Sequence, residues 1–259
     1  MNAMAANKAT RSSGRKVMAA MEEMGYAIDS KVEFRYDPNL PIMGYSRPLR
    51  KGYRVVAGKG ALNEQLLVTL LAHELSHVQR MASGHPSHSR AAIQAAYDGI
   101  RLDGPQKPYH DEILHDAINN VEDLYADGIA FDVMQRLDAV PPTGIGGFFL
   151  AWMKPRPAPG QDEQEAHWRA AHAMLGNARA LAQVKAHGSP AQVKQAKRIN
   201  AQLLSELPPL VVKSQPWFQA FYDDLPVNIS ERDFAHGLSD YIQRFLAVAE
   251  GRSGGGRRR

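Results

Sequence analysis

Residues 63–80 of the chain read NEQLLVTLLAHELSHVQR, a stretch without Gly or Pro that predicts one uninterrupted helix with Asn63 as its N-cap. Leucines at helical spacing give it a wide apolar flank, as expected of a helix in a domain core. His73 and His77 lie one turn apart, so their imidazole rings can bind one metal ion. Glu74 is placed to take a proton from a metal-bound water. HELSH therefore predicts a metal site, and the alternative is a surface histidine pair.

Composition limits the classes of protein that the chain can represent. Its 259 residues, 44% hydrophobic and 22% charged, suit one large globular domain or two small ones. The absence of cysteine excludes disulfides and thiolate metal sites. The N-terminus lacks the apolar core of a signal peptide, and no apolar run approaches membrane-spanning length. We therefore expect a cytoplasmic protein that does not contact membranes.

The net charge of +4 includes a basic C-terminal segment, RSGGGRRR at residues 252–259. Its composition predicts that residues 251–259 form a disordered basic tail. Nucleic acid is a partner that such a tail can contact, although a solvated terminus is the more frequent explanation.

The remaining pattern predicts an α+β fold that is mostly helical, with a small N-terminal β-sheet and a helical C-terminal region. Alternation predicts strands at residues 31–36 and 53–57, on either side of a turn-rich segment at 37–44. Helical spacing predicts helices at residues 15–24, 90–100, 111–137, 163–184, 190–204 and 230–250, the last with Ser230 and Asp233 as a capping box. The Pro-rich segment 154–160 then suggests a division into residues 1–154, 155–250 and 251–259.

A catalytic zinc takes three protein ligands, and HELSH supplies two of them. His85 does not have the spacing that would make it the third histidine of a metzincin, so we look first to the acidic face of the helix at 111–137, with His85 and His88 as the next candidates. Asp123 is the expected ligand, with Glu122 as the alternative. Asp127 follows Asp123 by one turn and is expected to orient a ligand histidine. Asn119 and His115 extend the same face, and Asn119 is a second candidate for this supporting role.

HELSH together with Asp123-Leu-Tyr-Ala-Asp127 resembles the zincin metallopeptidase superfamily in a gluzincin-like layout, with aspartate where glutamate is commoner. The wider pattern over residues 31–138 is similar to poorly characterised prokaryotic zincin-like proteins. The resemblance implies a zincin-like metallopeptidase domain at residues 1–154, holding one catalytic Zn²⁺. It also implies that a peptide or protein substrate is hydrolysed with Glu74 as general base.

Two further expectations follow from the resemblance. A donor for the developing oxyanion is needed, and the candidates are His85, His88, His115 and Tyr125. Zincins commonly bind the peptide along an edge strand that precedes the metal helix, and the predicted strand at residues 53–57 occupies that position. The alternative function is a regulatory or structural zincin-fold protein that binds metal and cleaves little or nothing.

Overall fold

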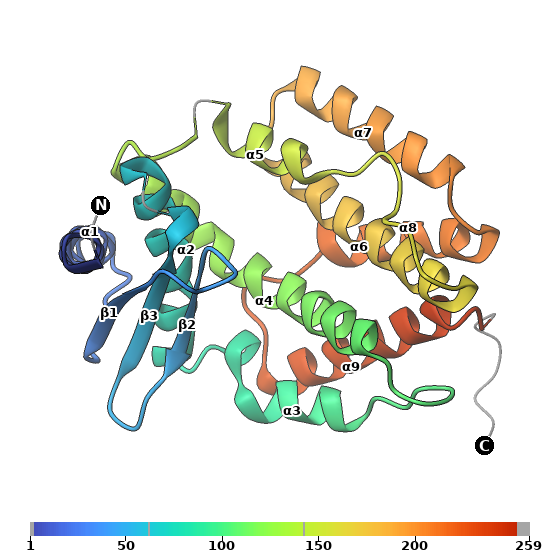
Figure 1. Ribbon diagram of the computed structural model, residues 1–259, viewed down its shortest axis with the longest axis horizontal. Coiled ribbons are helices and arrows are strands. Elements are labelled where there is room, and N and C mark those ends of the chain that lie inside the picture. The colour runs from blue at the N-terminus through green and yellow to red at the C-terminus, as the bar shows by residue number, and fades with distance from the viewer. Residues whose placement is uncertain (1–2, 62, 142, 253–259) are drawn as a thin grey trace. The chain divides into compact units, whose positions relative to one another are not determined.

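The computed structural model of the protein describes residues 3–61, 63–141 and 143–252 (Figure 1). The fold is mostly helical with one small sheet, in agreement with the predicted class. The elements in chain order are α1 (Ala3–Glu23), β1 (Val32–Asp37), β2 (Gly44–Pro48), β3 (Tyr53–Gly58), η1 (Lys59–Ala61), α2 (Glu64–Ala82), η2 (Pro86–His88), α3 (Arg90–Asp98), α4 (Pro108–Arg136), α5 (Gly144–Trp152), α6 (Glu163–His187), α7 (Pro190–Ser205), α8 (Pro209–Asp223) and α9 (Glu231–Ala249).

The chain forms two compact units, the first from residues 1–89 and 122–140 and the second from residues 90–121 and 141–259. This division differs from the boundary that the sequence suggests after Lys154. α5 lies before that boundary, yet it packs against α6 and α7 of the second unit. The Asn177 side chain on α6 accepts a hydrogen bond from the Lys154 backbone N–H (2.8 Å) and donates one to its carbonyl (2.9 Å). The Pro-rich segment therefore begins as a packed connection and not as a free linker.

The described sheet of the first unit has the strand order β1-β3-β2, with β1 parallel and β2 antiparallel to β3. β3 is central, so the expectation that this strand binds a peptide along a free edge is wrong. The edge strand next to α2 is β2, which the sequence does not predict because it is short and contains both Gly and Pro. A Cβ atom on Gly44 would lie 2.8 Å from the Val56 carbonyl, so glycine is needed for close pairing here.

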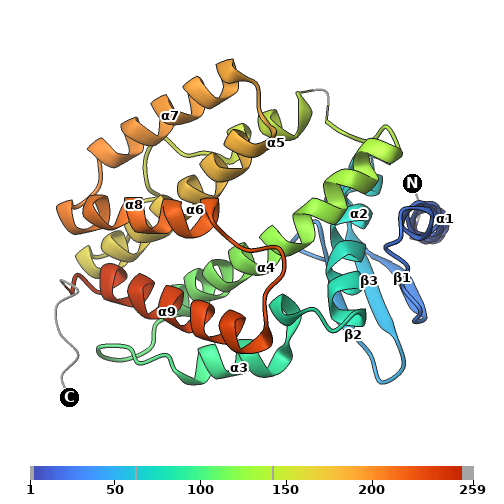
Figure 2. The ribbon, with the colours of Figure 1, turned by 180° about the vertical axis from the view of Figure 1, so that it is seen from behind.

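α1 starts twelve residues before the helix predicted from Arg15. Its buried face begins with small residues, Ala6, Thr10 and Gly14, which carry little hydrophobic signal. A Cβ atom on Gly14 would lie 2.4 Å from the Phe34 ring, so this glycine allows α1 to pack closely on β1. Figures 1 and 2 show α1 end-on beside β1.

The helix that carries HELSH, α2, forms as predicted. The Asn63 side chain accepts hydrogen bonds from the N–H groups of Gln65 (3.0 Å) and Leu66 (3.4 Å), which confirms the N-cap. The apolar face that starts at Leu67 packs against α1, β2 and β3, whereas Leu66 is exposed. Burial of one face fixes the rotation of α2, and with it the direction of its histidines.

The second unit is helical, and α6 packs against α5, α7, α8 and α9 (Figure 2). α5 and α8 were not predicted, since glycines in the first and an internal Pro216 in the second weaken the helical pattern. Ser230 caps α9, because its side chain accepts a hydrogen bond from the Asp233 N–H. The Asp233 carboxylate accepts a hydrogen bond from the Ser230 hydroxyl, which does not complete the predicted capping box.

The tail predicted at 251–259 lies outside the described residues from 253 onward. Among the described residues, none of the helices combines the length and apolarity needed to cross a membrane.

Candidate metal centre

Three predicted ligands converge in the first unit. His73 Nε2 and His77 Nε2 on α2 lie 3.2 Å apart. Asp123 Oδ1 on α4 lies 3.2 Å from His77 Nε2 and 3.7 Å from His73 Nε2. Among the described residues these three form a group whose ligand atoms all lie within 4.8 Å of one another. Asp123 therefore takes the place predicted for the third ligand, and Glu122 is not part of the group.

The spacing of these atoms fits one metal ion. In a tetrahedral zinc site with bonds of about 2.0–2.1 Å, neighbouring ligand atoms lie about 3.3 Å apart. The observed separations of 3.2, 3.2 and 3.7 Å lie on either side of this value. Imidazole nitrogens and carboxylate oxygens gathered this closely repel one another unless a proton or cation lies among them. The donor set thus suits an ion with three protein ligands and one open position.

Asp127 lies beside His73, in the position expected of a residue that orients a ligand histidine. Its buried Oδ1 lies 3.4 Å from His73 Nδ1, on the side of the ring away from the ligand atom. Burial lowers the pKa of His73, but the hydrogen bond to Asp127 and the charges of Asp123 and Glu74 outweigh it and raise this pKa to about 9. A histidine that attracts a proton so strongly without metal is in surroundings that favour a cation.

His77 is supported by a chain of hydrogen bonds that the sequence does not predict. His77 Nδ1 lies 2.8 Å from His88 Nε2, and His88 Nδ1 lies 2.8 Å from Ser87 Oγ. Ser87 Oγ in turn lies 2.8 Å from His85 Nδ1. If His77 uses Nε2 as a ligand atom, its proton is on Nδ1 and is donated to His88. His88 must then be neutral, and burial, with the charges of His77, His85 and Arg80, lowers its pKa to about 2.

This chain forms because η2 folds the segment after α2 back toward it. The His85 side chain accepts a hydrogen bond from the Ser87 N–H (3.2 Å) and caps this short helix, whose second residue is buried. His88 was expected among the oxyanion donors, yet its Nε2 faces His77. The spacing of GHPSH gave no signal for this, because only the fold of the loop brings His88 beside α2.

Glu74 is buried, at 7% exposure, in the chain position next to His73. No hydrogen-bond partner of its side chain is found in the described part of the chain, although its charge raises the pKa of His73. A carboxylate without a competing donor retains its lone pairs for a proton, as a general base requires.

Arg80 and Tyr125 connect the two helices of the centre. Arg80 Nε on α2 donates a hydrogen bond of 2.8 Å to the Tyr125 carbonyl on α4. The Tyr125 ring lies against His85, with 5.3 Å between ring centroids, and burial raises the pKa of its phenol to about 12. The phenol is therefore protonated at neutral pH and retains a donor. Arg80 was not predicted, although it lies three residues after His77 and so near the same helix face.

His115 and Asn119 lie on the part of α4 that belongs to the second unit. Their side chains are 3.1 Å apart, at Asn119 Nδ2 and His115 Nδ1, and neither belongs to the ligand group. The roles suggested for them stay predictions.

No protein-family model, curated protein or solved structure matches this chain.

Proposed function

We propose that this protein is a zinc-dependent metallopeptidase of the zincin type, which hydrolyses peptide bonds in a peptide or protein substrate. The observation that carries the proposal is the convergence of His73, His77 and Asp123 with Glu74 beside them. A purely structural zinc site usually has four protein ligands and needs no base. Three ligands, an open position and an adjacent buried carboxylate favour hydrolysis.

Each residue then has a defined task. Bound zinc would polarise the scissile carbonyl and lower the pKa of a coordinated water. Glu74 accepts the proton during attack and passes it to the leaving amine. Asp127 holds the His73 ring through Nδ1, and His88 accepts the proton of His77, so both ligand nitrogens stay correctly oriented. Tyr125, His85 and His115 remain the candidates for oxyanion donors.

The substrate peptide is expected along β2. This strand is an edge of the described sheet and packs against α2, so a peptide can pair with it by strand addition close to the metal helix. The edge is β2 and not β3, but the mode of binding is the one that the resemblance implies. A cytoplasmic location is part of the same proposal.

Metal identity is the first measurement, because two histidines and one carboxylate also bind Fe(II) in oxygenases. The protein is purified without metal-chelating tags, and its zinc, iron and manganese are measured by mass spectrometry. Zinc close to one equivalent supports the proposal. Iron as the only metal retained would contradict it.

The decisive test compares wild type with Glu74→Gln, using Glu64→Gln on the same helix as a matched control. Glu64 is exposed in the first turn of α2, far along the helix from the ligands. Cleavage of a peptide library should fall by about 10²- to 10⁴-fold in Glu74→Gln, the usual contribution of a general base, and stay unchanged in Glu64→Gln. Zinc content should be equal in all three proteins. If all three hold zinc and none cleaves, the protein is the regulatory or structural metal-binding protein that forms the alternative.

A further inference from the structure

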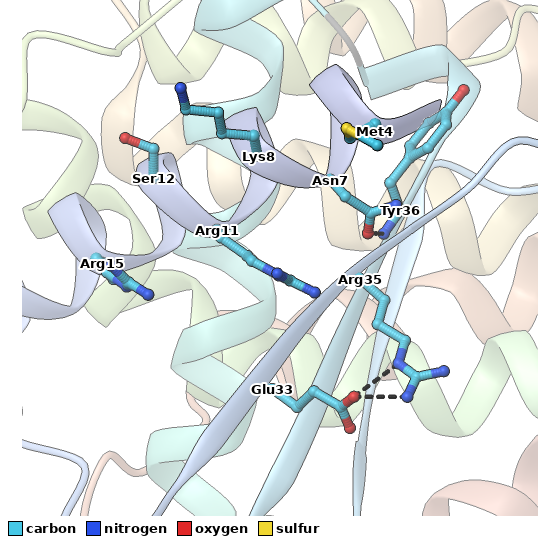
Figure 3. A pocket seen from close by; sticks show the side chains of 9 residues that line it. All are labelled: Met4, Asn7, Lys8, Arg11, Ser12, Arg15, Glu33, Arg35 and Tyr36. Atoms are coloured by element: carbon cyan, nitrogen blue, oxygen red, sulfur yellow. Dashed lines mark hydrogen bonds and ion pairs between the residues drawn. The ribbon is translucent and has the colours of Figure 1, made fainter. Parts of the chain in front are cut away.

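A basic groove lies between α1 and β1 in the first unit, apart from the metal centre (Figure 3). Its volume is about 820 Å³, within the range of about 300–1,000 Å³ that is typical of ligand sites. Four of its lining residues are cationic and one is acidic. The lining residues are Met4, Asn7, Lys8, Arg11, Ser12, Arg15, Glu33, Arg35 and Tyr36.

The cations of α1 lie along one side of this groove. Lys8, Arg11 and Arg15 are spaced three and four residues apart, so they share a helix face and extend over about 10 Å of the helix axis. All three are exposed, and none pairs with an acidic side chain in the described part of the chain. α1 contains no acidic residue before Glu22. The row of charges is therefore left uncompensated by the protein itself.

The opposite wall adds positive charge. Arg35 on β1 is the fourth cation of the lining, and Figure 3 shows Arg11 pointing across the groove toward it. Glu33 is the acidic residue of the lining, and its carboxylate is already shared by Arg35 (2.7 Å) and Arg54 (2.8 Å). One carboxylate between two guanidinium groups leaves no negative charge for Arg11.

Donors and an aromatic ring complete the lining. The Asn7 side chain accepts a hydrogen bond from the Tyr36 N–H (3.0 Å), which holds α1 against the end of β1. Tyr36 itself is half-buried and lies with Met4 at one end of the groove, whereas Arg15 lies at the other (Figure 3). A basic track with an aromatic platform is the combination that binds single-stranded nucleic acid, because phosphates follow the cations and a base stacks on the ring.

We propose that this groove binds a short segment of single-stranded nucleic acid. The charges are spread along about 10 Å of helix, which suits a chain of phosphates better than a single phosphate group. The concave shape excludes most of a duplex, which would touch only the rim. An anionic membrane fits less well, because the apolar face of α1 is already used in packing. The sequence pI of about 9.2 is in the range of nucleic-acid-binding domains. The proposal is independent of the peptidase proposal.

Binding is measured by fluorescence anisotropy with a labelled oligothymidylate of about 12 nucleotides, within the site size of single-strand binders. The test variant is Lys8→Ala/Arg11→Ala/Arg15→Ala. The matched control, Arg47→Ala/Arg50→Ala/Lys51→Ala, removes two arginines and one lysine from exposed positions in and after β2, which β3 separates from β1. Alanine favours helix at exposed positions, so α1 should remain folded, as circular dichroism can verify.

The test variant should bind the oligonucleotide at least about 10-fold more weakly at 0.1 M salt. The slope of its log affinity against log salt should be shallower by about 2, because each lost phosphate contact reduces this slope by about 0.7. The control should change affinity less than about 3-fold, as expected of surface charges outside the site. Tyr36→Leu should lose about 5-fold or more at every salt concentration without changing the slope, because stacking is not screened.

Several results would overturn the proposal. The groove is not the site if the test variant binds like wild type, or if the control loses as much affinity as the test variant. A single strand is not the ligand if duplex DNA, ATP or polyglutamate competes as strongly as the unlabelled oligonucleotide. If the triple variant does not fold, Arg11→Gln alone is measured against Arg50→Gln, and equal affinities of the two would also refute the proposal.

Discussion

The candidate metal centre and the tyrosine pair of the second unit are both clusters of polar groups, half-buried in the first and buried in the second, and they differ in how their hydrogen bonds are satisfied. Tyr222 Oη lies 2.7 Å from Tyr241 Oη, which donates a 3.1 Å hydrogen bond to the Ala117 carbonyl. Burial raises the pKa of both tyrosines, so both are neutral. Each proton there has an acceptor within the protein.

At the candidate metal centre the tautomer of His77 decides how the hydrogen bonds are satisfied. In the tautomer that a metal ligand needs, His77 directs its Nδ1 proton to His88, and the lone pair of its Nε2 faces Asp123 Oδ1 and His73 Nε2. This arrangement is stable only with a cation or an additional proton among the acceptors. A cluster of polar groups whose hydrogen bonds need an added cation or proton is a candidate site, whereas a cluster that completes them from within the protein is a structural element.

The largest expected effect comes from removing a candidate ligand of the metal centre. Asp123→Ala should reduce zinc affinity by more than about 100-fold, the upper end of what loss of a supporting residue alone costs. Glu122→Ala removes the neighbouring carboxylate and should leave affinity within about 3-fold, because Glu122 is not in the ligand group. Affinities are measured by competition with a chelator. Retained zinc in Asp123→Ala with loss in Glu122→Ala would reverse the ligand assignment.

A smaller effect is expected from the support of His73. Asp127→Asn should weaken zinc binding by about 10- to 100-fold, as is typical for residues that orient a ligand. The pKa of His73 is raised to about 9, so below that pH zinc must displace a proton from this histidine. Because of this competition, the zinc affinity of the wild type should fall about tenfold for each pH unit below about 9. Since Asp127 is the strongest group that raises this pKa, Asp127→Asn should start to lose affinity only at lower pH. Identical pH profiles of the two proteins would contradict this role of Asp127.

The same pKa shift predicts how the metal-free protein responds to alkali. The pKa of His73 is higher in the folded than in the unfolded chain, where it is about 6.5. Protonated His73 therefore stabilises the metal-free fold fully below about pH 6.5, and this contribution is lost as pH rises through about 9. Urea unfolding at pH 6 and pH 10 measures the loss, with Asp127→Asn as the variant in which it should shrink.

The smallest expected effect concerns the tyrosine pair of the second unit. Tyr241→Phe removes both hydrogen bonds of the tyrosine pair and leaves the Tyr222 hydroxyl without its partner. Unfolding free energy should fall by about 1–3 kcal/mol, the cost of a buried polar group that loses its partner. Zinc affinity and peptide cleavage should not change. A loss of zinc in this variant would show that the pair is not merely structural.

Much of the metal centre could be predicted because it depends on local periodicity. The spacing of His73 and His77 places them on one helix face whatever the rest of the fold does, and Asn63 fixes where that helix begins. Asp123 was preferred to Glu122 because of the resemblance to zinc peptidases, in which an acidic ligand is followed one turn later by Asp or Asn, the relation that Asp127 has to Asp123. The first half of α1 and the strand β2 could not be predicted from the sequence. The small residues of α1 and the glycine and proline of β2 have weak helix and strand propensities, so packing determines these elements.

The sequence by itself therefore determined the helix α2, the shared face of its two histidines with Glu74 beside them, and the acidic face of α4 that offers a third candidate ligand. Only the tertiary structure decided that Asp123 rather than Glu122 reaches the histidines, that His88 folds back to hold His77, and that β2 rather than β3 is the free edge. It also brought Arg35 opposite the cations of α1. The physical reason is that helical and strand periods order neighbours in the chain, whereas contacts between distant segments depend on which faces the hydrophobic core buries.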